Sequence, residues 1–155
     1  MIRTTRIPLQ LIELEDSSFH IMIEARFKRL KGNLIIDTGA SKTVLDYTFG
    51  KKIAQSIKKI KDQNSSGINA MITDSHLATV PSLTVGRLKI TDYPCVLLDL
   101  SHVNALYQKY CDKHIAGLIG SDFLVKYQAV IDYNKRLMKL TLPDNNTPVK
   151  KTRNS

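Results

Sequence analysis

The chain has 155 residues, of which 23 are Lys or Arg and 14 are Asp or Glu, so its formal charge is +9 at pH 7. That length fits one domain with its own core, and an apolar fraction of 43% beside a charged fraction of 24% argues against wholesale disorder. No apolar run approaches the ~20 residues of a membrane-spanning helix, so we expect no membrane segment. The N-terminal residues lack the apolar core of a secretory signal.

The cysteine, histidine and charge patterns favour an intracellular protein without a metal site. Cys95 and Cys111 lack partners at metal-ligand spacing, and two cysteines are few for a secreted disulfide scaffold, so we expect reduced, structural thiols and a cytoplasmic location. The four histidines do not cluster, so we expect no metal and no cofactor. The basic residues are dispersed, aromatic residues make up only 6%, and Trp is absent, so nucleic-acid binding is the weaker interpretation of the charge.

The first third of the chain predicts strands. Apolar residues alternate over Arg6–Glu13 and again over His20–Phe27, and turn residues lie between the two segments. Met22 falls on the polar face of the second segment, together with His20. A turn at 31–33 is expected to close a hairpin with the apolar run Leu34–Ile36, which is typical of a buried strand.

The middle of the chain predicts a helix and two hairpins. Asp46 can cap a helix over Tyr47–Ile57, followed by a polar loop. An exposed hairpin is expected over 68–80, and a second hairpin over 83–90 turns at Gly86.

The last third repeats this mixture. A strand over Cys95–Leu98 precedes a helix over Ser101–Tyr110, which is expected to pack through Val103, Leu106 and Tyr110. The apolar run Ile115–Gly120, a helix over Asp122–Tyr127 capped by Ser121, and a closing hairpin over Ala129–Leu142 follow. We therefore predict one mainly β domain over residues 1–143 with two or three short helices, then a basic polar tail over 144–155.

One buried strand ends in a carboxylate. Leu34–Ile36 leads directly into Asp37, Thr38 and Gly39, so Asp37 leaves the core at the strand end, and Gly39 lets another backbone approach. An ordinary Asx turn after a strand explains these three residues equally well. The signal strengthens further along, where a second apolar run, Gly117–Ile119, ends at Gly120 before a short helix.

Together these segments resemble the retropepsin-like aspartic peptidases, most closely the single-domain bacterial members. The shared pattern is two apolar residues, Asp-Thr-Gly-Ala-Ser, a flap hairpin, two apolar residues with Gly, and a short helix. The resemblance implies a closed β-barrel-like fold, no cofactor, and a homodimer that cuts peptide or protein substrates, with one catalytic Asp from each chain.

The resemblance also assigns roles to residues. Asp37 would be catalytic, and the loop around it would be supported by Thr38, Gly39, Ala40 and Ser41, with Thr38 bracing the dimer. Leu118, Ile119 and Gly120 would support that loop from the second motif. The flap would be formed by Thr73, Asp74, Ser75 and His76. In viral members an acidic residue and an Arg pair where this chain has Ser41 and Ser121, so we expect a serine hydrogen bond there.

The chemistry of two carboxylates fits this assignment. Two adjacent carboxyl groups share one proton, so one can activate water while the other polarises the peptide carbonyl. A chain with a single Asp-Thr-Gly needs a second copy to do this. The alternative is a catalytically weak or inactive peptide- or protein-binding module on the same fold.

Overall fold

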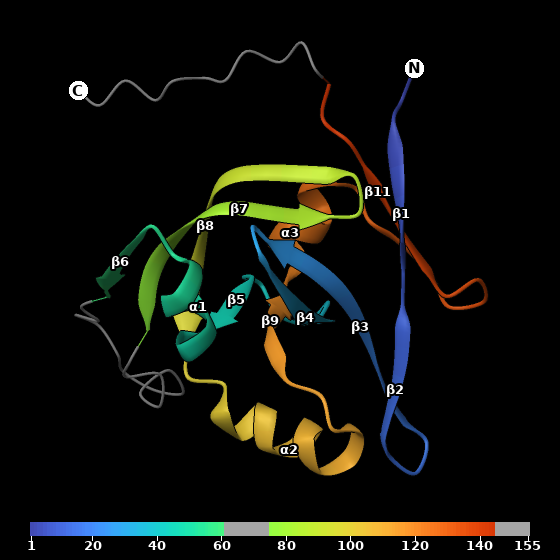
Figure 1. Ribbon diagram of the computed structural model, residues 1–155. Helices are drawn as coiled ribbons and strands as arrows, with labels where there is room; N and C mark the ends of the chain where they lie inside the picture. The colour runs from blue at the N-terminus through green and yellow to red at the C-terminus, as the bar shows by residue number, and fades with distance from the viewer. Residues whose placement is uncertain (61–74, 145–155) are drawn as a thin grey trace.

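The structure, a computed structural model, describes residues 1–60 and 75–144 (Figure 1). The strands and helices follow one another as β1 (Thr4–Pro8), β2 (Gln10–Glu15), β3 (Ser18–Phe27), β4 (Leu30–Ile36), β5 (Val44–Asp46), α1 (Tyr47–Ile53), β6 (Ser56–Lys59), β7 (His76–Val85), β8 (Leu88–Leu98), α2 (Ser101–Cys111), β9 (Ile115–Ile119), α3 (Ser121–Lys126), β10 (Val130–Asp132) and β11 (Leu137–Thr141). The predicted mainly β fold with short helices is confirmed.

Six strands close into a barrel. The order β3-β4-β9-β5-β8-β7 runs around the sheet, and β7 pairs back onto β3 at Arg26 and Thr84. Only two of these contacts are parallel, β4 with β9 and β5 with β8. The large apolar cluster inside includes Ile23, Leu34, Leu97 and Ile119, all fully buried. Closure satisfies the backbone hydrogen bonds that an open sheet would leave exposed at its edges.

A separate three-stranded sheet joins the two ends of the described chain, in the order β1-β11-β10. Figure 1 shows β1 and β11 lying side by side, and Thr4 pairs with Thr141. The predicted single strand over Arg6–Glu13 is therefore wrong, because it divides between two sheets. The break falls at Leu9, whose N–H donates to the Arg136 carbonyl at 2.9 Å.

Helix α2 covers a second apolar cluster, which lies outside the barrel core. Tyr107 from α2 is buried there with residues of four strands, namely Ile12, Leu14, Met22, Ile35 and Ile115. Met22 was expected on a polar face, but it is fully buried because α2 covers that side of β3. The inward face of α2 also differs from the predicted one. Val103 packs inward as expected, but it does so with Tyr107 and Cys111, while Leu106 and Tyr110 are exposed.

Two element boundaries in the structure differ from the predicted ones. The expected turn at 31–33 lies inside β4, and the chain turns earlier, at Lys28, which adopts φ 54°. The first helix ends at Ile53 and not at Ile57, because Ala54 is extended and Ser56–Lys59 pairs with β7. The N-cap of α1 is Asp46, as predicted, and its carboxylate accepts the Phe49 N–H at 3.2 Å.

The C-terminal half follows the prediction more closely. The hairpin that turns at Gly86 and the closing hairpin β10–β11 are both present. Helix α3 begins at Ser121, so Gly120 and not Ser121 occupies the N-cap, and no side chain caps it. The domain boundary at residue 143 stays a prediction, and residues 145–155 of the expected tail lie outside the described residues.

Candidate active site

Asp37 follows the last residue of β4 and continues that strand's pairing for one more hydrogen bond. Its N–H donates to the Ile119 carbonyl at 2.9 Å, which fixes the backbone against β9. The Asp37 carboxylate then accepts the Gly39 N–H at 3.0 Å, and the Asp37 carbonyl accepts the Ala40 N–H at 3.2 Å. The side chain is half-buried, while Thr38 and Gly39 are exposed. The loop therefore presents a carboxylate at the surface from a rigid strand end.

The second motif lies directly beside the first. Parallel pairing sets Leu118 next to Ile35 and Ile119 next to Ile36, with Leu118 facing the α2 cluster and Ile119 facing the barrel core. The two segments that resemble the family in sequence are thus neighbours in space, although β5 to α2 separate them along the chain.

Gly120 permits this close approach. A Cβ on Gly120 would lie 2.6 Å from the carbonyl carbon and oxygen of Lys42 and 2.9 Å from the Ala40 oxygen. Those are backbone atoms, so they cannot swing away as a side chain could. One residue later, the Ser121 N–H donates to the same Ala40 carbonyl at 2.7 Å. The Asp37 loop is therefore seated on the start of α3.

Two residues that the sequence interpretation passed over complete this junction. The Asp122 carboxylate accepts the Thr43 N–H at 2.9 Å, the Thr43 hydroxyl at 2.8 Å and the Phe123 N–H at 2.8 Å. Partial burial would raise the pKa of Asp122, but these donors and the Lys42 charge hold it below its usual value.

The expected serine link is therefore corrected. Among the described residues, the side-chain hydrogen bonds across this junction come from Thr43 and Asp122 rather than from Ser41 and Ser121. The sequence offers one signal for this pair, an acidic residue in the first turn of a short helix.

The flap candidates are only partly described. Thr73 and Asp74 lie outside the described residues. The Ser75 carbonyl accepts the Ile60 N–H at 3.0 Å. His76 begins β7, where it pairs with Lys59 on one side and Leu97 on the other. His76 is thus on an arm of the β6–β7 hairpin rather than at its turn.

A histidine and a tyrosine, neither singled out as functional from sequence, meet near Asp37. The Tyr107 hydroxyl and His20 Nδ1 lie 2.6 Å apart, and their rings meet edge to face. Burial raises the pKa of the Tyr107 phenol to about 12, with the charges of Cys111 and Asp37 adding to the rise. Asp37 is therefore close enough for its charge to act on this phenol.

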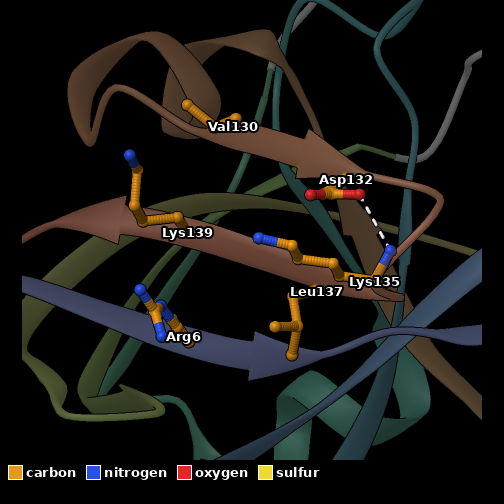
Figure 2. Close-up of a pocket in the computed structure, with 6 residues that line it drawn as sticks. All are labelled: Arg6, Val130, Asp132, Lys135, Leu137 and Lys139. Carbon is orange, nitrogen blue, oxygen red and sulfur yellow. Dashed lines mark hydrogen bonds between the residues drawn. The ribbon is translucent and has the colours of Figure 1, made fainter.

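A groove on the outer face of the three-stranded sheet is a different feature. It is lined by Arg6, Val130, Asp132, Lys135, Leu137 and Lys139 (Figure 2). The Lys135 N–H donates to the Asp132 carboxylate at 2.9 Å. None of these residues belongs to the Asp37 loop or to β9, so the groove is not part of the site above. Within residues 1–60 and 75–144, no group of three potential metal ligands forms.

Comparison with known proteins identifies the class. Residues 23–123 match the family model of the aspartyl proteases, and the chain belongs to that family. The matched segment contains β4, the Asp37 loop and β9, and it ends in α3.

The fold is likewise that of a known structure. The crystal structure of a retropepsin-like aspartic protease from Rickettsia conorii is similar, with a TM-score of 0.53 and 17% identity over 92% of this chain and 96% of that chain. The retroviral protease-like domain of Ddi1 from Leishmania major has a TM-score of 0.47 and 13% identity over 81% of this chain and 96% of that one. A search of curated proteins gave no match. Among the described helices, none is long and apolar enough to cross a membrane.

Proposed function

We propose that the protein is a homodimeric aspartic endopeptidase in which two Asp37 carboxylates, one from each chain, activate a water molecule against a peptide bond. The observation that carries the proposal is the setting of Asp37 in a chain of the aspartyl protease family. Its backbone is fixed by β9, its carboxylate is half-buried, and the loop that follows it is exposed.

The proposed dimer rests on the number of catalytic carboxyl groups that one chain supplies. The chain has a single Asp-Thr-Gly, and the reaction needs one carboxyl group that is protonated and one that is ionised. A twofold axis beside the exposed loop brings Asp37 against its own copy, and Thr38 would then brace one loop against the other. Among the described strands, β1 and β10 are the outer strands of the three-stranded sheet, so their edges are a further place where a second chain would dock.

The proposed reaction needs no covalent intermediate. The ionised carboxylate takes a proton from the water, which attacks the peptide carbonyl, while the protonated carboxyl donates to the carbonyl oxygen. The carboxyl group that took the water proton then donates it to the leaving nitrogen, while the other carboxylate takes a proton from a hydroxyl of the gem-diol. The carbon–nitrogen bond breaks, and both carboxyl groups return to their starting protonation states. Gly39, exposed and without a side chain, would leave room for the peptide backbone, and Ser41, Leu118, Ile119 and Gly120 would hold the loop in place.

The remaining parts of the proposal concern the flap, the boundaries and the compartment. The flap, for which Thr73, Asp74, Ser75 and His76 are the candidates, would close over the peptide. Of these, Ser75 directly precedes β7 and His76 begins it. The catalytic domain would span residues 1–143, with a basic tail over 144–155. The two free cysteines support a cytoplasmic location.

The decisive experiment combines sedimentation with cleavage of a mixed peptide library, read by mass spectrometry at mildly acidic pH. Wild type is expected to sediment as a dimer and cleave, whereas Asp37→Asn should dimerise without cleaving. Asp99→Asn is the matched control, because Asp99 also follows an apolar strand and accepts an N–H two residues later, that of Ser101 at 2.8 Å. Cleavage that survives in Asp37→Asn overturns the assignment. A dimer that binds peptides without cleaving them supports the binding module instead.

A further inference from the structure

The pairing of β3 with β4 runs toward His20 and Asp37 and ends two residues before them, at Met22 and Ile35. Met22 pairs with Ile35 and Ile23 with Leu34, so each residue's partner number falls by one as its own rises by one. Extended by two residues beyond the last pair, the same register would set His20 opposite Asp37. Residues directly opposite on antiparallel strands share a face of the sheet.

That shared face is the one that α2 covers. Met22 and Ile35 both belong to the cluster beneath α2, and side chains two residues along a strand point the same way. His20 and Asp37 therefore follow them toward α2, at the end of the cluster. The effect of the Asp37 charge on Tyr107, a residue of α2, agrees with this placement.

The imidazole is held in a defined orientation. Tyr107 is 3% exposed and lies 2.6 Å from Nδ1 of His20 through its hydroxyl. The helix that carries Tyr107 is itself fixed to β9, because the Asn104 side chain donates to the Ile115 carbonyl at 3.1 Å and accepts the Ile115 N–H at 2.6 Å. A ring held this way loses little further freedom when it meets a ligand.

The buried hydroxyl favours one arrangement of the ring hydrogens. The phenol of Tyr107 stays protonated at neutral and acidic pH, and among the described residues its hydroxyl has Nδ1 of His20 as its hydrogen-bond partner. We therefore infer that the hydroxyl donates to Nδ1 of a neutral imidazole, which leaves the ring hydrogen on Nε2. With a charged imidazole, Nδ1–H donates to the phenol oxygen and Nε2 still bears a hydrogen. His20 thus presents an Nε2–H donor in both states.

Among residues 1–60 and 75–144, none accepts a hydrogen bond from that donor. The hydrogen bond that His20 makes there joins Nδ1 to Tyr107 and leaves Nε2 without a partner in this part of the chain. His20 is half-buried, so the ring reaches the surface beside the Asp37 loop. A preorganised donor next to a carboxylate that reacts with peptide is placed to bind an acceptor on that peptide.

We propose that His20, positioned by Tyr107, is a specificity-determining residue. Its Nε2–H would donate a hydrogen bond to an Asp, Glu, Asn or Gln side chain of the peptide next to the scissile bond. The inference rests on the proposed peptidase function. The positive net charge, from 23 basic and 14 acidic residues, would also attract acidic peptides.

The test compares cleavage of paired peptides that differ only in Gln or Leu, or Glu or Leu, beside the scissile bond. His20→Phe keeps a ring without a donor and is expected to lower the preference for Gln and Glu up to about tenfold, the size of one hydrogen bond. Tyr107→Phe should lower it less, and His20→Gln, which keeps an N–H donor, should retain most of it. His102→Gln is the matched control, an exposed histidine on α2.

The outcomes separate the two proposals. If wild type cleaves no peptide as a dimer, the peptidase function fails, and this inference fails with it. If wild type cleaves and His20→Phe, folded by circular dichroism, keeps the same preference, only the inference is overturned. Should His20→Phe not fold, Tyr107→Phe and His20→Gln decide. Nitrogen NMR of the imidazole gives a readout without activity, since a neutral ring with hydrogen on Nδ1 also overturns the proposal.

Discussion

The hydroxyl of Thr43 donates to Asp122 Oδ1 at 2.8 Å across 79 positions of chain. The same hydroxyl accepts the Gly120 N–H at 3.0 Å, so it joins the end of the Asp37 loop to both the N-cap and the first turn of α3. Thr43 is buried, and its own N–H is taken by Asp122 as well. This side-chain pair, together with the backbone hydrogen bonds from Asp37 to Ile119 and from Ser121 to Ala40, holds the candidate catalytic loop against the second motif.

Replacing Asp122 with Asn should loosen that junction. An amide keeps one acceptor oxygen and introduces a donor that faces the Thr43 N–H, so we expect a loss of about 2 kcal/mol, or roughly 4–8 °C in Tm. Asp132→Asn is the control, because Asp132 accepts one exposed N–H, that of Lys135. Thermal unfolding followed by circular dichroism measures both. Equal, small shifts for the two variants would contradict a structural role for the Thr43–Asp122 pair.

The same carboxylate predicts how stability depends on pH. Hydrogen bonds from Thr43 and Phe123 outweigh the effect of burial, so the pKa of Asp122 is lower in the folded than in the unfolded chain. Its contribution is complete above the unfolded pKa, near 4, and is lost as pH falls through the lowered folded pKa. Denaturant unfolding of wild type and Asp122→Asn should therefore differ by a constant amount near neutrality, with the gap closing in acid. A gap that widens in acid would reverse the sign argued here.

Two glycines of the site should respond differently to a single added methyl group. In Gly120→Ala the new Cβ would meet the Lys42 and Ala40 backbone at 2.6–2.9 Å, so we expect a loss of 3 kcal/mol or more, beyond the ~1–3 kcal/mol usual for overpacking. In Gly39→Ala it would meet only the Asp37 carboxylate, at 3.4 Å, so the fold should keep its Tm. Gly39→Ala should still impair cleavage if the peptide backbone crosses that position. Comparable Tm losses in both variants would show that the loop is packed differently.

The cysteines should differ in reactivity. Burial raises the pKa of the Cys95 thiol to about 12, so Cys95 stays a thiol and resists alkylation in the folded protein. Cys111 is half-buried at the end of α2, with its thiol donating to the Tyr107 carbonyl at 3.1 Å. Mass spectrometry after brief alkylation should find Cys111 modified first and Cys95 modified only after denaturation. Early labelling of Cys95 would contradict its placement in the barrel core.

The parts of the fold that sequence predicted are those governed by local patterns. The apolar run Leu34–Ile36 marks a strand buried on both faces, and Asp46 and Gly86 have the residue types that a helix cap and a left-handed turn require. The Asp37 loop was found because its motif is contiguous. None of these assignments needed knowledge of what packs against the segment.

The parts that sequence missed depend on distant neighbours. Met22 is apolar at a position where alternation indicates a solvent face, and only the packing of α2 explains its burial. The pairs Thr43–Asp122 and His20–Tyr107 join residues that are 79 and 87 positions apart in the chain, so no local pattern reveals either pairing. Gly32 suggested a turn, but it lies within β4, where a Cβ would come 2.8 Å from Cβ of Ala116.

The proposal that two chains share one active site predicts that an inactive chain will inhibit an active one. Each productive dimer would need Asp37 from both subunits, so adding an equal amount of Asp37→Asn chain should lower activity per wild-type chain to about half once subunits exchange. A tenfold excess should lower it to about a tenth, as few wild-type chains then find each other. Asp99→Asn, with its Asp37 intact, should not inhibit. Activity that stays constant across the mixing series would place a complete site within one chain, which a single Asp-Thr-Gly does not supply.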